Sequence, residues 1–209
     1  VELGMEITGC KGAFERSDVE VRQLEGLTPR CGLLTGEAPP DWIQISENGL
    51  SFLVDIQRGQ KTGFYLDQRR NRQRIRQLAR GREVLNCFCY TGGFTVYAMA
   101  GGAACVTSVD TSQEAVQSGR ENVRLNGFLD RDEDWVIADV FRYLRALRDQ
   151  GRSFDLIILD PPKFAPTAAQ AERAARGYKD INLLAMKLLR PGGLLATFSC
   201  SGGLSAELF

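Results

Sequence analysis

The chain has 209 residues, of which 44% are hydrophobic and 25% are charged. This length and composition fit one or two globular domains and exclude long disordered stretches. Basic and acidic residues are equal in number, so no overall basic field attracts nucleic acid, and any such binding needs a local patch. Histidine is absent, which excludes Ser-His-Asp triads, Cys-His dyads and His-ligated zinc.

The six cysteines show no CxxC spacing, so the sequence does not predict a metal site. No apolar run reaches the roughly 18 residues that a membrane span requires, and no signal peptide is recognisable. We therefore expect a cytoplasmic protein that keeps its thiols reduced, binds no metal and contacts no membrane.

Turn signals and short strand patterns in residues 1–80 predict a small α+β domain. The clearest feature is a β-hairpin over residues 42–55, in which Asn48-Gly49 separates two apolar runs. Asn-Gly is the strongest short signal for a two-residue hairpin turn, because both residues tolerate positive φ angles.

A basic helix is predicted over residues 67–80, with Leu66 and either Ile75 or Leu78 facing the core. No acidic residue interrupts the arginines of this segment. They could form a phosphate-binding face for RNA, or only a solvated helix surface with scattered ion pairs. The arginines are Arg69, Arg70, Arg72, Arg74, Arg76, Arg80 and Arg82.

From residue 81 onward apolar runs alternate with helical segments, which predicts a second domain at 81–209. This alternation is typical of βαβ units, so the predicted fold class is α/β, with a Rossmann-like, doubly wound parallel sheet. Ligands of such sheets bind beyond the carboxyl ends of the strands. Strands are predicted at 84–88, 104–109, 135–138, 154–159 and 194–198. Helices are predicted at 93–100, 112–126, 140–149 and 168–189.

The first strand of this domain runs into a glycine turn, Asn86-Cys87-Phe88-Cys89-Tyr90-Thr91-Gly92-Gly93-Phe94. The two glycines let a ligand approach the backbone, and the N–H groups that open the next helix can bind a carboxylate. The motif is not GxGxxG, which argues against a dinucleotide. The alternative is an ordinary strand-to-helix turn.

Acidic residues follow the second and third strands. Asp110 lies roughly 20 positions after the glycine turn, where an acid is placed to hold ribose hydroxyls. Asp139 could accept a hydrogen bond from an adenine amine, with Val140 or Phe141 against the ring. For each acid the alternative is a helix cap.

The fourth strand ends in Asp160-Pro161-Pro162-Lys163-Phe164, where two prolines remove two backbone donors and stiffen the loop. An acid thus projects rigidly from the sheet edge, although a plain rigid turn is the alternative. The fifth strand ends in a segment that carries Cys200 between two serines. A free cysteine is often only a small buried hydrophobe.

Taken together, these segments resemble class I S-adenosylmethionine-dependent methyltransferases, and more narrowly the ribosomal large-subunit RNA methyltransferase I family, which makes 5-methylcytosine. The resemblance implies an RNA-binding PUA domain before residue 1, a central α/β insert at 1–80, and a further helix and strand pair after residue 209. The segments that carry it are Gly59-Gln60-Lys61-Thr62-Gly63-Phe64-Tyr65-Leu66-Asp67-Gln68-Arg69, residues 86–94, residues 160–164, Arg176-Gly177-Tyr178-Lys179-Asp180-Ile181-Asn182, and residues 197–202.

The resemblance also implies S-adenosylmethionine as cofactor, large-subunit ribosomal RNA as partner, and a set of site residues. Asp160 and Lys163 would face the target base. Residues 61–69 would cover the methionine end of the cofactor, and the glycine turn would pass its methionine part. The implied cofactor contacts are Lys61, Asp67, Gln68, Arg69, Phe88, Tyr90, Thr91, Gly92, Gly93, Asp110, Asp139 and Val140.

Methylation at C5 of cytosine gives Cys200 a chemical role. C5 is a poor nucleophile until a thiolate adds to C6, and Cys200 is suitably placed for this addition at a strand end. Asp160 could hydrogen-bond the base and stabilise the adduct. Lys163 stands where some related enzymes carry a second cysteine, so a two-cysteine mechanism is not expected. Cys87 and Cys89 are interpreted as packing residues.

Two alternatives remain open at this point. Asp160-Pro161-Pro162 is also typical of methyltransferases that act on exocyclic amines, in which the acid and a proline carbonyl hold the amine and no thiol is needed. The chain could also be a non-catalytic fragment that binds cofactor or RNA. A nicotinamide dehydrogenase is disfavoured, because the diphosphate fingerprint and histidine are both absent.

Overall fold

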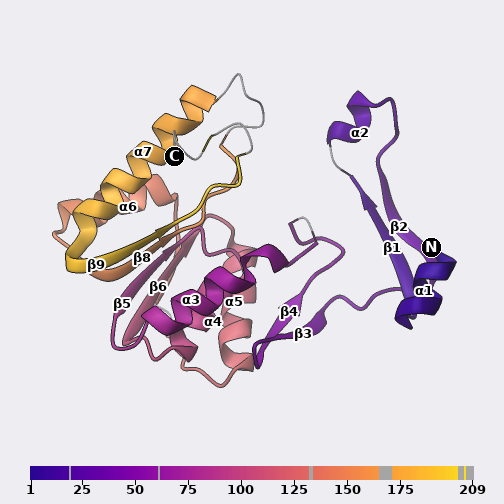
Figure 1. Ribbon diagram of the computed structural model, residues 1–209, viewed down its shortest axis with the longest axis horizontal. Coiled ribbons are helices and arrows are strands. Elements are labelled where there is room, and N and C mark those ends of the chain that lie inside the picture. Colours follow the sequence, from indigo (N-terminus) through magenta and orange to yellow (C-terminus); the bar gives the residue numbers. More distant parts are fainter. Residues whose placement is uncertain (19, 61, 132–133, 165–170, 202–204, 206–209) are drawn as a thin grey trace. The chain divides into compact units, whose positions relative to one another are not determined.

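The computed structural model describes residues 1–18, 20–60, 62–131, 134–164, 171–201 and 205 (Figure 1). The chain divides into two compact units. Unit 1 comprises Val1–Ile45 and Leu53–Asp67, and unit 2 comprises Ser46–Phe52 and Gln68–Phe209. The last boundary between the units falls between residues 67 and 68. The sequence analysis places a domain boundary between residues 80 and 81, and that boundary stays a prediction.

Unit 2 contains a five-stranded parallel sheet in the order β7-β6-β5-β8-β9. This confirms the α/β fold class with a Rossmann-like parallel sheet. The predicted strand bounds are met within one residue, except that the last strand begins five residues earlier than expected. The strands are β5 (Glu83–Cys87), β6 (Cys105–Asp110), β7 (Trp135–Ile137), β8 (Phe154–Leu159) and β9 (Leu189–Thr197).

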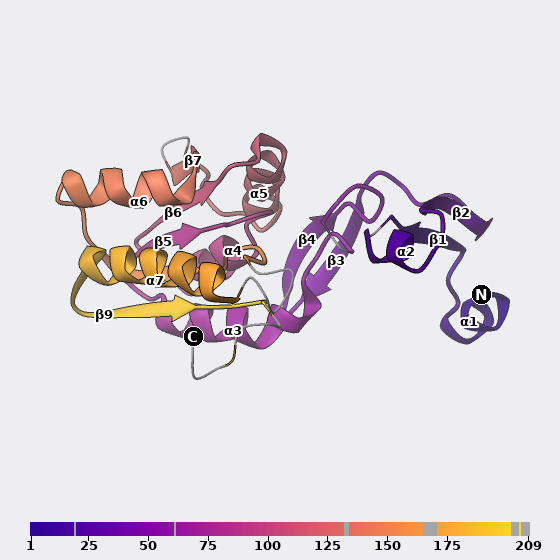
Figure 2. The same cartoon turned by 90° about the horizontal axis from the view of Figure 1, so that it is seen from above.

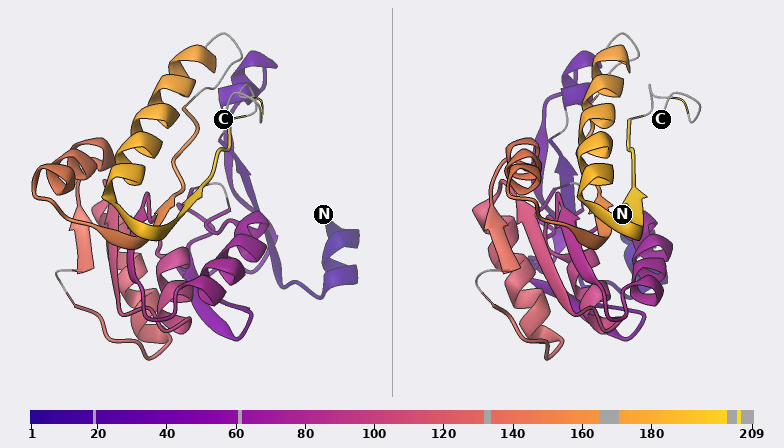
Figure 3. Two further views of the ribbon diagram at one scale, coloured as in Figure 1. Left: turned by 60° about the vertical axis from the view of Figure 1, so that its left-hand side comes forward. Right: turned by 90° about the vertical axis from the view of Figure 1, so that its left-hand side faces the viewer.

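Helices cover both faces of this sheet, because its central strands are apolar on both sides. One core cluster joins Leu85 and Ile157 of the sheet to α6 and α7. The other core cluster joins Val84 and Ile158 of the sheet to α3 and α4. Figures 2 and 3 show that α7 and α3 lie on opposite faces of the sheet. Within the described residues, no helix has both the length and the apolar character to cross a membrane. The helices are α3 (Arg69–Leu78), α4 (Gly93–Ala100), α5 (Gln113–Leu125), α6 (Val140–Asp149) and α7 (Ala171–Leu188).

Unit 1 is built on an antiparallel pair, β1 (Gly12–Ser17) and β2 (Arg30–Gly36), with the short helices α1 (Glu2–Thr8) and α2 (Glu20–Leu24). The pair ends where Gly12 faces Gly36. A Cβ atom at Gly36, whose φ is +79°, would lie 2.2 Å from the carbonyl oxygen of residue 11, so only glycine fits this close crossing.

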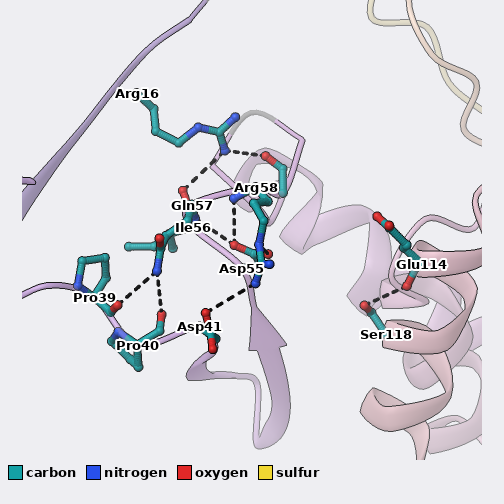
Figure 4. A network of polar contacts seen from close by, with 11 residues as sticks. Arg16, Pro39, Pro40, Asp41, Asp55, Ile56, Gln57, Arg58, Glu114 and Ser118 are labelled. Carbon is teal, nitrogen blue, oxygen red and sulfur yellow. Dashed lines mark hydrogen bonds and ion pairs between the residues drawn. The ribbon is translucent and has the colours of Figure 1, made fainter. Parts of the chain in front are cut away.

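A loop of unit 1 is held by polar contacts (Figure 4). Asp55 Oδ1 accepts hydrogen bonds from the backbone N–H groups of Gln57, at 2.9 Å, and Arg58, at 2.8 Å. The Arg16 guanidinium donates to the carbonyls of Ile56 and Gly59, which ties strand β1 to the loop. Side-chain hydrogen bonds thus hold the backbone of this loop, which directly precedes the segment 61–69.

The predicted hairpin is confirmed as β3 (Ile43–Glu47) and β4 (Leu50–Val54). Its turn residues Asn48 and Gly49 have φ angles of +52° and +78°, as a type I′ turn requires. Side chains alternate along β4, where residues 50, 52 and 54 are buried and the two between them are half-buried.

The tip of this hairpin is anchored in unit 2 by a buried ion pair. Arg72 of α3 donates two hydrogen bonds to the carboxylate of Glu47, at 2.8 and 2.9 Å, and both side chains are about 3% exposed. The hydroxyl of Tyr97 donates to Glu47 Oε1 at 2.9 Å, and Asn48 donates to that hydroxyl at 2.8 Å. Burial and the bond to Glu47 raise the pKa of Tyr97 to about 12.

The basic helix predicted at 67–80 exists as a 3-10 turn, Leu66–Gln68, followed by α3. Ile75 faces the core as predicted, with 2% exposure. Leu66 does not, because it is 69% exposed, and that part of the prediction is wrong. The periodicity of an α-helix does not extend through the tighter 3-10 turn, so Leu66, the first residue of that turn, falls on a different face.

We predict that Glu47→Gln lowers the free energy of unfolding by about 3–5 kcal/mol, because it leaves Arg72 as a buried charge without its counter-ion. Urea unfolding followed by circular dichroism measures this change. The matched control is Glu121→Gln, which removes an exposed partner of Arg124 and should cost less than about 1 kcal/mol. Equal losses in the two variants would contradict the assignment of Glu47 as the anchor.

Candidate active site

The carboxyl ends of parallel strands share one edge of a sheet, and each strand of unit 2 delivers a different group there. Strand β5 is followed by the glycine turn, β6 ends in Asp110, and Asp139 stands just beyond β7. Strand β8 is followed by Asp160, and β9 by Cys200 three residues after its end. The parallel pairing of the five strands places their carboxyl ends along one edge of the sheet, whereas the functional roles predicted for these residues stay predictions.

The glycine turn has an unusual backbone. Phe88 and Tyr90 have φ angles of +59° and +47°, and Gly92 has +74°. Non-glycine residues reach this left-handed region at a cost of roughly 1–3 kcal/mol each, and such residues cluster at functional sites. The surrounding structure must therefore fix the turn, and this strain distinguishes it from the ordinary strand-to-helix connection considered above.

Three groups outside the turn hold it in place. The carboxylate of Asp110 accepts a hydrogen bond from the Tyr90 N–H at 2.9 Å. The buried side chain of Asn122 donates to the carbonyl of Thr91 at 2.9 Å. The turn also packs beside Trp135, since a Cβ atom on Gly92 would lie 3.0 Å from the indole Cη2.

Helix α4 begins directly after this turn, with Gly92 as its N-cap residue. Glycine has no side chain to bond the first N–H groups of the helix, and no side-chain cap is present. These groups, including the N–H of Gly93, are suited to bind a carboxylate or another anionic group.

The two acids after β6 and β7 are held differently. Asp110 Oδ1 accepts from the Ser112 N–H at 3.0 Å, and Ser112 rather than Asp110 is the N-cap of α5. Asp139 is the N-cap of α6, because its Oδ1 accepts from the Arg142 N–H at 2.9 Å. Val140 is 1% exposed and packs in the core beside α7. The adenine contacts predicted for residues 139 and 140 stay predictions.

The thiol of Cys200 lies next to the proline loop that follows β8. Strands β8 and β9 pair in parallel, and the Phe198 N–H donates to the Leu159 carbonyl at 2.9 Å. This pairing brings the two following segments together, so that Cys200 Sγ is 3.9 Å from the carbonyl oxygen of Pro161. The Cys200 side chain is exposed rather than buried in the core.

Asp160 occupies the position before this carbonyl and is partly buried. Its Oδ1 accepts a weak hydrogen bond from Gln68 Nε2 at 3.4 Å, which places Gln68 beside the predicted catalytic acid. Lys163 is exposed two residues beyond the Pro161 carbonyl. The structure thus brings Gln68, Asp160 and Cys200 to one place, around the loop that starts at Pro161.

An aromatic cluster that the sequence did not predict connects these loops. The ring of Phe164 lies 6.4 Å from Phe88, 5.8 Å from Phe141 and 4.8 Å from Tyr178, measured between centroids. Tyr178 is only 2% exposed, so it belongs to the core rather than to a surface that stacks on a base. No local sequence pattern indicates these contacts, because the four rings come from four separate parts of the chain.

The remaining predicted cofactor contacts come from the segment 61–69. Lys61 lies outside the described residues. Asp67 is exposed at the end of unit 1, and its cofactor contact stays a prediction. Arg69 is 60% exposed and lies 3.6 Å from Glu47 Oε2, an ion pair with the anchor of the hairpin. Among the described residues, no group of His, Cys, Asp or Glu could hold a metal ion.

Cys87 and Cys89 are confirmed as packing residues. They are 0% and 6% exposed, and burial raises the pKa of both thiols well above its usual range. The negative charge of Asp110 adds to this effect at Cys89. A buried thiol with a raised pKa is a poor nucleophile, which separates these two cysteines from Cys200.

The chain is similar in sequence to known methyltransferases. A model of S-adenosylmethionine-dependent methyltransferases matches residues 21–204. The ribosomal RNA large subunit methyltransferase I of Shewanella denitrificans is 52% identical over 208 residues, which cover 100% of this chain and 52% of that protein. The chain spans about half the length of the curated relatives it matches.

Solved structures show the same architecture. A SAM-dependent methyltransferase structure from Streptococcus mutans superposes with a TM-score of 0.81 at 27% identity, covering 100% of this chain and 52% of that one. A second methyltransferase, solved in complex with SAH, has the same TM-score and identity and is covered to 53%. These likenesses confirm the class I methyltransferase fold.

We predict that iodoacetamide alkylates Cys200 in the folded chain at neutral pH, together with the exposed Cys10 and Cys31. Cys87 and Cys89 should stay unmodified because they are buried and largely protonated. Peptide mass spectrometry against time measures each rate, and the urea-unfolded chain is the control in which all thiols react. Labelling of Cys89 as fast as Cys200 in the folded chain would contradict this geometry.

Proposed function

Because the chain belongs to the S-adenosylmethionine-dependent methyltransferases, we propose that it methylates C5 of a cytosine in large-subunit ribosomal RNA, with Cys200 as the nucleophile. The observation that carries this proposal is the exposed Cys200 thiol, 3.9 Å from the carbonyl oxygen of Pro161, the residue that follows Asp160. The names of relatives that are at least 50% identical support the choice of substrate. A cytoplasmic location is part of the same proposal.

The residues at the sheet edge fit the cofactor of this family. The uncapped N-terminus of α4 suits its carboxylate, and the strained backbone from Phe88 to Gly92 suits a close approach of its methionine part. Asp110 would hold the ribose hydroxyls, and Asp139 would face the adenine. When bound, the cofactor supplies a methyl group on a positively charged sulfur.

The thiol chemistry follows from what cytosine needs. The Cys200 thiolate forms a bond to C6 of the base, and the electron pair of the C5–C6 double bond becomes available at C5. C5 then takes the methyl group. A base removes the proton from C5, the double bond re-forms, and the bond between sulfur and C6 breaks to return the thiolate.

Asp160 and Lys163 would act on the base during these steps. The Asp160 carboxyl group can hydrogen-bond the ring or the amino group and stabilise the adduct. Its rigid placement before two prolines preorganises this contact. Lys163 is exposed beyond the same prolines and would face the target base. The chain contains no histidine, and a carboxylate or a water molecule is the proposed acceptor of the C5 proton.

We predict that Cys200→Ala abolishes formation of 5-methylcytosine, because no adduct can form. Digestion of treated ribosomal RNA followed by nucleoside mass spectrometry measures the product, and Cys31→Ala, which also removes an exposed thiol, is the matched control. Binding of S-adenosylhomocysteine by calorimetry should be retained in both variants. Persisting methylation of an exocyclic amine in Cys200→Ala would instead support chemistry on the nitrogen with Asp160 and the Pro161 carbonyl.

Helix α3 is the proposed contact for the RNA backbone. Its first turn follows Gln68, whose side chain reaches Asp160, so α3 begins beside the proposed catalytic acid. Arg70 and Arg74 are exposed on the side of α3 away from the buried Ile75, and neither forms an ion pair within the described part of the chain. Arg72 is excluded from this role by its buried pair with Glu47.

We predict that Arg70→Gln and Arg74→Gln each weaken binding of a large-subunit RNA fragment and reduce the salt dependence of affinity. Each lost phosphate contact makes the slope of log K against log salt concentration less negative by about 0.7–0.9. Fluorescence anisotropy over a salt series measures the slope. Arg142→Gln, which removes an exposed arginine from α6, is the control and should leave the slope unchanged. Equal slopes in all variants would contradict an RNA contact on α3.

A further inference from the structure

A buried hydrogen bond links helix α7 to the segment that carries Cys200. The hydroxyl groups of Tyr178 and Ser201 lie 3.1 Å apart, and the two residues are 2% and 4% exposed. Because both hydroxyl groups are buried, breaking this bond would cost roughly 0.5–1.5 kcal/mol. Ser201 is therefore held firmly, although it follows the end of β9.

Cys200 itself lies between two residues that are tied to each other. The N–H of Ser201 donates to the hydroxyl of Ser199 at 3.3 Å, so the backbone turns at Cys200. Both flanking serines thus hold the turn, and the thiol is exposed at its centre.

The Tyr178 ring is fixed by its own surroundings. It packs against Phe164 with centroids 4.8 Å apart, and Phe164 belongs to the loop that contains Pro161. A Cβ atom on Gly177 would lie 3.3 Å from the Phe164 ring, so the glycine at this position allows the approach. Tyr178 therefore touches the proline loop through its ring and the cysteine turn through its hydroxyl.

We propose that Tyr178 is a positioning residue for the Cys200 thiol, and that its hydroxyl, acting through Ser201, keeps the sulfur aimed at the base held beside Asp160. A phenylalanine would fill the core equally well, so the hydroxyl serves the bond to Ser201 rather than packing. Because a misplacement of about 1 Å can cost about 100-fold in rate, a fixed sulfur matters for addition to C6. This inference rests on the proposed role of Cys200.

The test uses Tyr178→Phe, which removes only the hydroxyl, and an RNA substrate that contains 5-fluorocytidine. With S-adenosylmethionine present, sulfur bonds to C6 and C5 is methylated, but fluorine cannot leave as a proton does, so the covalent complex persists. The rate of complex formation is read on denaturing gels. It should fall roughly 10- to 100-fold in Tyr178→Phe, while affinity for S-adenosylhomocysteine stays unchanged.

The matched control is Tyr143→Phe, which removes the hydroxyl of a half-buried tyrosine on α6 and should leave the rate unchanged. Ser201→Ala should slow the reaction as much as Tyr178→Phe, and the double variant no further, because all three break one bond. A wild-type rate in Tyr178→Phe, or additive losses in the double variant, would overturn the inference. Failure of the wild-type protein to form the complex would instead overturn the role of Cys200.

Discussion

The parallel pairing of β8 with β9 is the constraint on which the candidate site depends. It sets Leu159 opposite Thr197, so the chain leaves both strands at the same edge and at the same level. The acid and prolines that follow one strand are therefore neighbours of the thiol that follows the other, although about 40 residues separate them in sequence. A shift of this register would separate Cys200 from Asp160 while leaving both strands intact.

The second condition is rigidity, and polar side chains provide it where regular structure ends. The turn after β5 contains left-handed residues and is held by Asp110 and Asn122. The hairpin tip is held by the ion pair of Glu47 with Arg72 of α3, and Gln68, the N-cap residue of α3, donates a hydrogen bond to Asp160. The contacts of Asp110, Asn122 and Gln68 fix segments that follow or face the carboxyl ends of the strands, so these loops keep defined positions.

Most of the sheet and the position of Cys200 were predictable from the sequence, because apolar runs and turn residues are local signals. The hairpin at Asn48-Gly49 is the clearest case. The contacts that organise the site were not predictable, since they depend on residues distant in sequence. Arg72 looked like one of several surface arginines, and only the fold reveals its buried partner. Tyr178 likewise gave no sign that its hydroxyl meets Ser201, and Leu66 was misplaced because a 3-10 turn precedes α3.

The most direct test of the central claim is a crystal structure of the protein with S-adenosylhomocysteine and RNA that carries a methylated 5-fluorocytidine adduct. The account predicts a covalent bond between Cys200 Sγ and C6 of the base, with the Asp160 carboxyl group hydrogen-bonded to the same ring. A base that is bonded to another cysteine, or that lies against Asp160 with its amino group facing the cofactor sulfur and Cys200 unmodified, would contradict it.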